Sequence, residues 1–270
     1  MDLLSTRVNG HEIIYRTAGT RVNTPLVLLH GWGASSLYWE RACEDLLLHH
    51  HCIMPDLPGF GLSEKPRIDY SLDNLTTLFE GFLDRLELDQ IDLVGHSMGS
   101  LIAIRAAVRN PDRIRRLCVI NPPLRGWEAL SAFHRFSLTP GIRCLMHLIM
   151  KTPFGRKLIA KDFTVETELK REYIDDLGRP TYRAGIQSIL SLVDADSVPL
   201  IRKCKMPVLL VGTDKDQVIA PSQKDLYPTG DNFQSVLIND AGHIPMVEKP
   251  EEFTQALSSF LIPSPASISS

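Results

Sequence analysis

Short runs of apolar residues recur along the chain, separated by longer stretches of mixed polarity. Four runs are apolar almost throughout: residues 26–29, 91–94, 117–120 and 208–211. Runs of this length without regular polar alternation are typical of strands that are buried on both faces, as in a parallel sheet. We therefore predict that these four runs are central strands of one sheet.

A hairpin is predicted at the start of the chain. Residues 3–8 and 12–17 have the composition of strands, and Asn9-Gly10 stands between them. Asn-Gly favours a two-residue turn because both residues tolerate positive φ. We expect the two strands to pair as a hairpin.

Segments with helical spacing of apolar residues lie between the predicted strands. Helices are predicted over residues 38–48, 72–86 and 98–108. In the second of these, six apolar residues fall on one face: Leu72, Leu75, Phe79, Phe82, Leu83 and Leu86. The alternation of strand and helix predicts an α/β fold with a mostly parallel sheet flanked by helices.

The alternation stops near residue 122 and resumes near residue 206, with helical stretches but no strand pattern between. We predict that residues 1–122 and 201–262 form one core domain. Residues 123–200 are then a helical cap inserted into it. Residues 263–270 are rich in Pro, Ser and Ala, and we expect a flexible tail there.

The composition is that of an ordinary globular protein. Of 270 residues, 44% are hydrophobic and 23% are charged, with a formal net charge of −3. This charge produces no strong field for nucleic acid, so we expect no nucleic-acid partner. Residues 1–7 do not resemble a signal peptide, and no apolar run approaches the ~18–20 residues that span a bilayer. We expect a cytoplasmic monomer or homodimer without stable membrane insertion.

No metal site or disulfide framework is indicated. The five cysteines are odd in number, widely spaced and without a CxxC pair. His49, His50 and His51 are adjacent rather than four residues apart, and we expect them to end the helix at residues 38–48.

Residues 95–99 read Gly-His-Ser-Met-Gly, which fits G-x-S-x-G. They follow the predicted strand at 91–94 and open the helix at 98–108, which is the setting that this motif requires. Small residues two positions before and after the serine avoid clashes in the tight turn. The helix N-terminus also supplies N–H groups that suit a developing oxyanion. Ser97 is therefore a candidate nucleophile, the alternative being a helix-capping serine.

A base and an orienting acid are sought on later loops. His243 follows a predicted strand at residues 235–238, and a histidine on such a loop is free to reach the nucleophile. The acid should accept the imidazole N–H and stabilise the imidazolium. Asp214 and Asp216, after the strand at 208–211, are the candidates, and the order serine, acid, histidine is preserved.

Two further motifs complete the pattern. Residues 30–33 read His-Gly-Trp-Gly, and residues 56–63 read Asp-Leu-Pro-Gly-Phe-Gly-Leu-Ser. Together with the segments above, they resemble the α/β-hydrolase superfamily over roughly residues 10–122 and 200–262. The resemblance implies an eight-stranded, mostly parallel sheet flanked by helices, with an inserted helical cap.

The resemblance also implies roles for individual residues. Asp216 is favoured over Asp214 as the acid, because the residues after it match those that usually follow the acid in this fold. The backbone N–H groups of Trp32 and Met98 are the expected oxyanion donors. His30 is expected to pin its loop by hydrogen bonds.

Subfamily resemblances are weaker. Haloalkane dehalogenases and epoxide hydrolases carry Asp where this chain has Ser97. Residues 30–33 are similar to the carboxylesterase of biotin synthesis, but His96 and Ser100 depart from that enzyme. Carbon–carbon bond hydrolases usually carry Trp where this chain has Ile244.

The predicted function is a carboxylesterase-like serine hydrolase that cleaves small to medium, mainly apolar esters and needs no cofactor. The alternatives are a lactonase, thioesterase or C–C hydrolase with the same triad, or a receptor-like binding protein with low turnover. An apolar patch at residues 145–150 either floors the pocket, docks at a lipid surface or packs onto the core. The predicted pocket residues are Trp32, His96, Leu145, Ile149 and Ile244.

Overall fold

A computed structural model describes residues 1–21, 24–44, 46–47, 49–165 and 169–262. The predicted tail at 263–270 lies outside the described residues. Eight strands form one sheet in the order β1-β2-β4-β3-β5-β6-β7-β8. Their bounds are β1 Asp2–Val8, β2 His11–Ala18, β3 Thr24–Leu29, β4 His50–Pro55, β5 Ile91–His96, β6 Ile114–Ile120, β7 Val208–Thr213 and β8 Phe233–Ile238.

The sheet is mostly parallel, as predicted. The parallel pairs are β4–β3, β3–β5, β5–β6, β6–β7 and β7–β8. The pairs β1–β2 and β2–β4 are antiparallel. The predicted hairpin is confirmed, since Val8 pairs with His11 across the turn. Asn9 and Gly10 both have positive φ there, 50° and 83°, as a type I′ turn requires.

The central strands are buried on both faces, which explains their unbroken apolar runs. Val27 and Leu29 belong to one core cluster and Leu26 and Leu28 to the other, each with 0% exposure. Burying an aliphatic side chain contributes about 1.5–3 kcal/mol. A polar residue in these runs would therefore be costly on either face.

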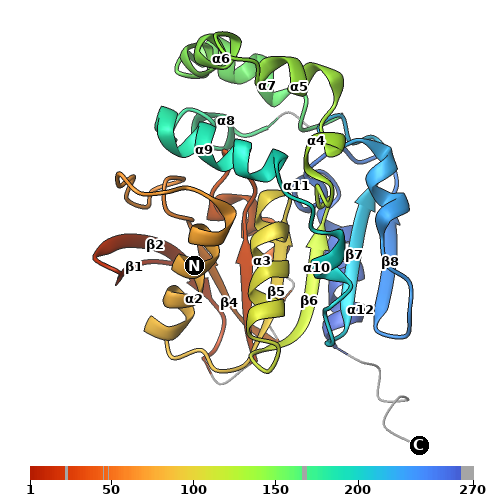
Figure 1. Ribbon diagram of the computed structural model, residues 1–270. Coiled ribbons are helices and arrows are strands. Elements are labelled where there is room, and N and C mark those ends of the chain that lie inside the picture. The colour runs from red at the N-terminus through yellow and green to blue at the C-terminus, as the bar shows by residue number, and fades with distance from the viewer. Residues whose placement is uncertain (22–23, 45, 48, 166–168, 263–270) are drawn as a thin grey trace, which may run out of the picture.

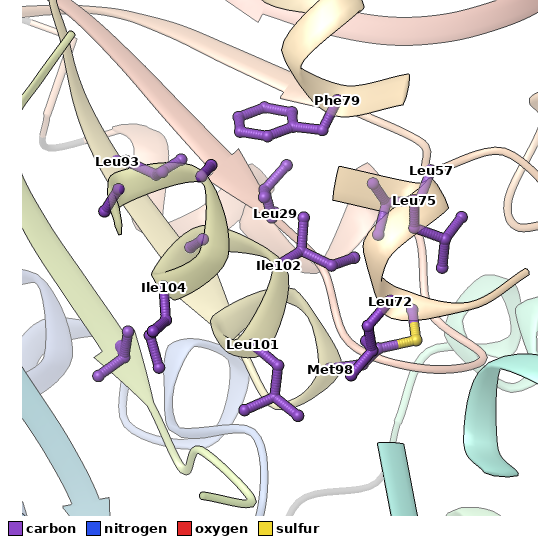
Figure 2. Packing of buried hydrophobic residues seen from close by; sticks show 14 of the residues in the cluster. Leu29, Leu57, Leu72, Leu75, Phe79, Leu93, Met98, Leu101, Ile102 and Ile104 are labelled. Carbon is purple, nitrogen blue, oxygen red and sulfur yellow. The ribbon is translucent and has the colours of Figure 1, made fainter. Parts of the chain in front are cut away.

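Helices cover both faces of the sheet. One core cluster includes α2 (Leu72–Arg85), α3 (Met98–Arg109) and α10 (Val198–Ile201), and the other includes α1 (Glu40–Glu44), α11 (Pro245–Glu248) and α12 (Pro250–Leu261). Figure 2 shows the first cluster, in which Met98 and Ile102 of α3 lie close to the side chains of α2. This packing fixes the N-terminus of α3 relative to the sheet.

The helical segment predicted between β6 and β7 lies above one end of the sheet (Figure 1). Besides α10, it contains α4 (Gly126–Ala129), α5 (Ala132–Ser137), α6 (Ile142–Met150), α7 (Pro153–Ala160), α8 (Arg171–Asp176) and α9 (Tyr182–Val193). Helix α9 contacts α2, which is one of the helices that cover the sheet, and it also contacts α6. Helices α5, α6 and α7 are farthest from the sheet.

Two local predictions were wrong. The helix expected over residues 38–48 is a 3₁₀ turn, Ser36–Trp39, followed by the short α1; residues 45 and 48 are outside the described part of the chain. His50 and His51 begin strand β4 instead of ending a helix. Tertiary pairing decides this, because β4 lies between β2 and β3 and Thr17 Oγ1 bonds His51 Nε2 at 2.7 Å.

Candidate active site

Ser97 lies at the turn between β5 and α3, with φ 52° and ψ −117°. A non-glycine residue rarely adopts positive φ, so the turn is strained and is held by its surroundings. A Cβ at Gly95 would lie 2.5 Å from the carbonyl oxygen of Gly99, and one at Gly99 would lie 2.5 Å from that of Leu29. Both glycines are therefore required by close backbone contact, as the motif predicted.

The loop after β3 lies against this turn. A Cβ at Gly31 would be 3.2 Å from the Cβ of Ser97. His30 holds the loop, because its Nε2 accepts the N–H of Leu57 at 2.9 Å, so its Nδ1 carries the proton and donates to the carbonyl of Gly31 at 2.7 Å. Burial lowers the pKa of His30, which favours this neutral form. The loop thus places Gly31 beside Ser97.

His243 and Asp216 are hydrogen bonded. Nδ1 of His243 lies 2.8 Å from Oδ2 of Asp216, while Oδ1 of Asp216 accepts the N–H groups of Val218 and Ile219 at 2.8 and 2.9 Å. Burial acts to raise the pKa of Asp216, but His243 and the two N–H donors hold it below its ordinary value. The carboxylate is therefore charged and fixed in direction.

Asp214, the other candidate acid, is directed elsewhere. Its Oδ1 accepts the N–H of Ala241 at 3.4 Å, and its Oδ2 lies 3.8 Å from Nζ of Lys215. The hydrogen bond to Ala241 thus ties the loop after β7 to the loop that carries His243. Asp216 is the carboxylate that meets the imidazole.

The backbone of His243 is held from several sides. Its carbonyl accepts Nε2–H of His96 at 2.8 Å and Nδ2–H of Asn121 at 3.1 Å. Its N–H donates to the carbonyl of Phe163 at 2.9 Å, so the inserted helical segment also fixes this loop. Burial, followed by the neighbouring His243, lowers the pKa of His96 to about 3. The His96 ring is therefore a neutral hydrogen-bond donor.

Asn121 was not anticipated as a site residue. It follows β6 with φ 43°, a conformation that asparagine tolerates better than most residues. Its Nδ2 also donates to Oγ1 of Thr213 at 3.1 Å. An asparagine directly after a buried strand was the available signal, but the sequence does not show that β6 and the His243 loop meet.

Ser97 and His243 line the same cavity, which encloses about 690 Å³ including its opening to solvent. Among the predicted pocket residues, Trp32, His96 and Ile244 line it. Its walls are mainly apolar and include residues from the inserted helices: Leu130, His134, Ile159, Phe163, Ile189 and Leu192.

The other two predicted pocket residues lie elsewhere. Leu145 is 56% exposed and is not among the residues that line this cavity. Ile149 lines a neighbouring groove instead. Helix α6 presents a different face to the interior, with Arg143, Met146 and Met150 lining a chamber next to the cavity. Apolar spacing alone did not specify which side of this helix faces inward.

A link between the core and the inserted helices was also missed, as was a histidine in the cavity wall. The indole N–H of Trp32 donates to the carbonyl of Gly185 in α9 at 2.9 Å. His134, on α5, lines the cavity, with Nδ1 2.7 Å from Oγ of Ser131 and Nε2 3.8 Å from Oδ2 of Asp162. Nine histidines and no fixed spacing gave His134 no distinguishing signal.

The chain is similar to several known proteins over most of its length. The chain is 29% identical over 249 residues to (E)-2-((N-methylformamido)methylene)succinate hydrolase of Acinetobacter baylyi, covering 89% of this chain and 91% of the relative. Its fold matches a membrane phospholipase A (TM-score 0.84, 28% identity, 96% of this chain and 85% of that one). It also matches the enol-lactonase of Burkholderia xenovorans LB400 (TM-score 0.79, 26% identity, 96% and 99%).

A family model described as the alpha/beta hydrolase family matches residues 26–256, which include every loop described above. The chain therefore belongs to the alpha/beta hydrolase family.

Proposed function

We propose that this protein is a serine hydrolase that cleaves carboxylic esters through an acyl-enzyme on Ser97. The observation that carries the proposal is the hydrogen bond between His243 Nδ1 and Asp216 Oδ2 at 2.8 Å, beside a cavity that both Ser97 and His243 line. With Nδ1 protonated and bonded to the carboxylate, the neutral imidazole keeps Nε2 free of a proton. Nε2 is then the atom that acts as base.

Acylation follows from this arrangement. His243 Nε2 takes the Ser97 hydroxyl proton as Oγ attacks the ester carbonyl, and Asp216 stabilises the imidazolium. The imidazolium then protonates the leaving alcohol as the C–O bond breaks. A water molecule, deprotonated by the same imidazole, attacks the acyl-enzyme and releases the acid and free Ser97.

The oxyanion of each tetrahedral intermediate is assigned to the backbone N–H groups of Met98 and Trp32. Met98 is the first residue of α3, where N–H groups have no partner within the helix. Gly31 packs against Ser97, and Trp32, the next residue of the loop, lines the same cavity as Ser97. Each such donor stabilises a transition state by about 3–4 kcal/mol.

A mainly apolar acyl group or alcohol of small to medium size suits the cavity. Its wall is built from aliphatic and aromatic side chains of both core and inserted helices. We propose that residues 123–200 act as the substrate-selecting cap over a core formed by residues 1–122 and 201–262. Substrate size is then set by the cap residues.

A lactone is the second candidate substrate. A lactone is a cyclic ester, so the same acylation step opens it, with the alcohol left attached to the acyl group. The specific observation in its favour is the likeness to the enol-lactonase, which extends over 96% of this chain at 26% identity.

Labelling with a fluorophosphonate probe tests the proposal. We expect the wild type to be labelled and Ser97→Ala to be unlabelled, with turnover of nitrophenyl esters reduced at least about 10³-fold. Ser100→Ala is the matched control, because Ser100 is a neighbouring buried serine whose hydroxyl donates to the carbonyl of Gly95. A folded wild type that stays unlabelled would indicate a binding protein, and a panel of esters and lactones would rank the two substrate classes.

A further inference from the structure

The outermost helices of the inserted segment expose large apolar side chains. We define the outer cap face by five residues of α5, α6 and α7, with exposed fractions of 54–80%: Phe136, Leu145, Leu148, Phe154 and Leu158. A concentration of exposed apolar residues on one part of a surface marks an interaction site. These helices lie at the end of the molecule away from the sheet (Figure 1).

The exposed apolar residues of α6 lie on a different side of the helix from those that face the interior. Met146 and Met150 of α6 line the chamber next to the catalytic cavity. Leu145 and Leu148 lie on the other side of the same helix and are 56% and 64% exposed. Helix α6 is therefore apolar on both sides, and only the inner one has a partner within the chain.

The charge around the outer cap face points to the kind of partner. Residues 131–161 contain six Lys and Arg residues and no Asp or Glu, in a chain of net charge −3. Arg156 is paired with Asp175 at 2.8 Å. Lys151, directly after α6, is exposed and donates to the carbonyls of Gly178 and Pro180, and none of the described carboxylates forms an ion pair with it. Apolar side chains with Lys and Arg beside them suit a surface of anionic lipid.

The groove beside the outer cap face shares two lining residues with the catalytic cavity. Leu158 lines a groove together with Ser131, His134 and Ile159. His134 and Ile159 line the cavity that contains Ser97 as well. Leu158 of the outer cap face therefore lies beside residues that also form the wall of the catalytic cavity.

We propose that the outer cap face docks reversibly on an anionic lipid surface and that the enzyme takes ester substrates partitioned into that surface. This inference rests on the proposed ester hydrolase function for its second half. Docking is peripheral, since no helix among the described residues is long and apolar enough to cross a membrane. Apolar contact and attraction between Lys or Arg and anionic headgroups both contribute to it.

Co-sedimentation with vesicles tests the docking step without any need for turnover. Purified Ser97→Ala protein is mixed with phosphatidylcholine vesicles, with or without phosphatidylglycerol. We expect binding to be at least tenfold tighter with phosphatidylglycerol and to weaken as salt rises. Adding Leu148→Ser and Phe154→Ser should reduce this binding at least tenfold. Adding Leu237→Ser is the matched control, because Leu237 is 50% exposed on β8, away from the cap.

The outcomes separate docking from catalysis. In the active enzyme, the cap double variant should keep full turnover of a soluble nitrophenyl ester and lose turnover of an ester embedded in anionic vesicles. Vesicle binding without any turnover would refute the proposed function and leave docking standing. Docking is refuted when the parent protein does not bind the vesicles or when the cap double variant binds them as tightly as the parent does. Docking is also refuted when sedimentation shows that the parent protein is a dimer and the cap double variant is a monomer. A second copy of the chain then covers the outer cap face.

Discussion

The loops around Ser97 and the helices above them are built in opposite ways. The loops are buried and tied by short hydrogen bonds, with Ser97, His96 and His243 only 2–6% exposed. The outer helices leave Phe154 80% and Leu148 64% exposed. A reaction that depends on atomic positions requires the first arrangement. The outer helices are not held in this way, so we expect substitutions around Ser97 to alter chemistry and those in the inserted helices to alter substrate use.

The largest effect is expected at the acid. Asp216→Asn should lower kcat by about 10⁴-fold, because an amide in place of the carboxylate favours the wrong imidazole tautomer and leaves the imidazolium unstabilised. Asp214→Asn, the matched control two residues away, should stay within about tenfold of the wild type, since it holds only a loop. Steady-state kinetics on a nitrophenyl ester measure both. An inactive Asp214→Asn beside an active Asp216→Asn would reassign the acid.

A glycine pair then compares the packing of the two regions directly. Gly99→Ala should destabilise the fold by about 3 kcal/mol or more, because its Cβ would lie 2.5 Å from the carbonyl oxygen of Leu29. Gly185→Ala, in cap helix α9, should be neutral or stabilising by up to about 1 kcal/mol, since the nearest atom is 3.6 Å away. Denaturant unfolding measures both. Equal losses would mean that the cap is packed as tightly as the core.

Asn121 tests how far the support of His243 extends. In Asn121→Gly the glycine tolerates the positive φ, and the donor to the His243 carbonyl is removed. We expect kcat to fall by about tenfold, which corresponds to the net free energy of one hydrogen bond. Glu87→Gly replaces another residue with positive φ, 55°, that lies exposed at the end of α2. This control should keep wild-type kcat. An unchanged kcat in Asn121→Gly would show that His96 and Phe163 suffice to hold the loop.

The smallest effect is expected in the cap. His134→Gln should raise KM about three- to tenfold with little change in kcat, because His134 lines the cavity while its ring nitrogens face Ser131 and Asp162 of the inserted segment. Burial lowers the pKa of His134, so the wild-type side chain is a neutral polar group at pH 7. His147→Gln, on α6 against Tyr182, is the control and should leave KM unchanged. A fall in kcat alone would move His134 into the chemistry.

The amino-acid sequence was sufficient for seven of the eight strands and for Ser97 and His243 of the candidate triad. Apolar runs mark strands that are buried on both faces, and the Asn9-Gly10 turn and the glycines around Ser97 reflect local backbone requirements. Patterns of this kind are local, so each can be recognised within about ten residues. The order of the loops along the chain then paired Ser97 with His243 and with two possible carboxylates.

Long-range contact decided the remainder. Asp216 rather than Asp214 meets the imidazole because the loops after β7 and β8 adopt one particular arrangement. His50 lies in a strand because it pairs with Thr24 of β3, and Asn121 meets the His243 carbonyl across 122 positions of sequence. Both sides of α6 carry large apolar residues, so hydrophobic spacing could not tell Leu145 from Met146. Only packing against neighbouring helices, among them α7 and α9, selects which side of that helix is buried.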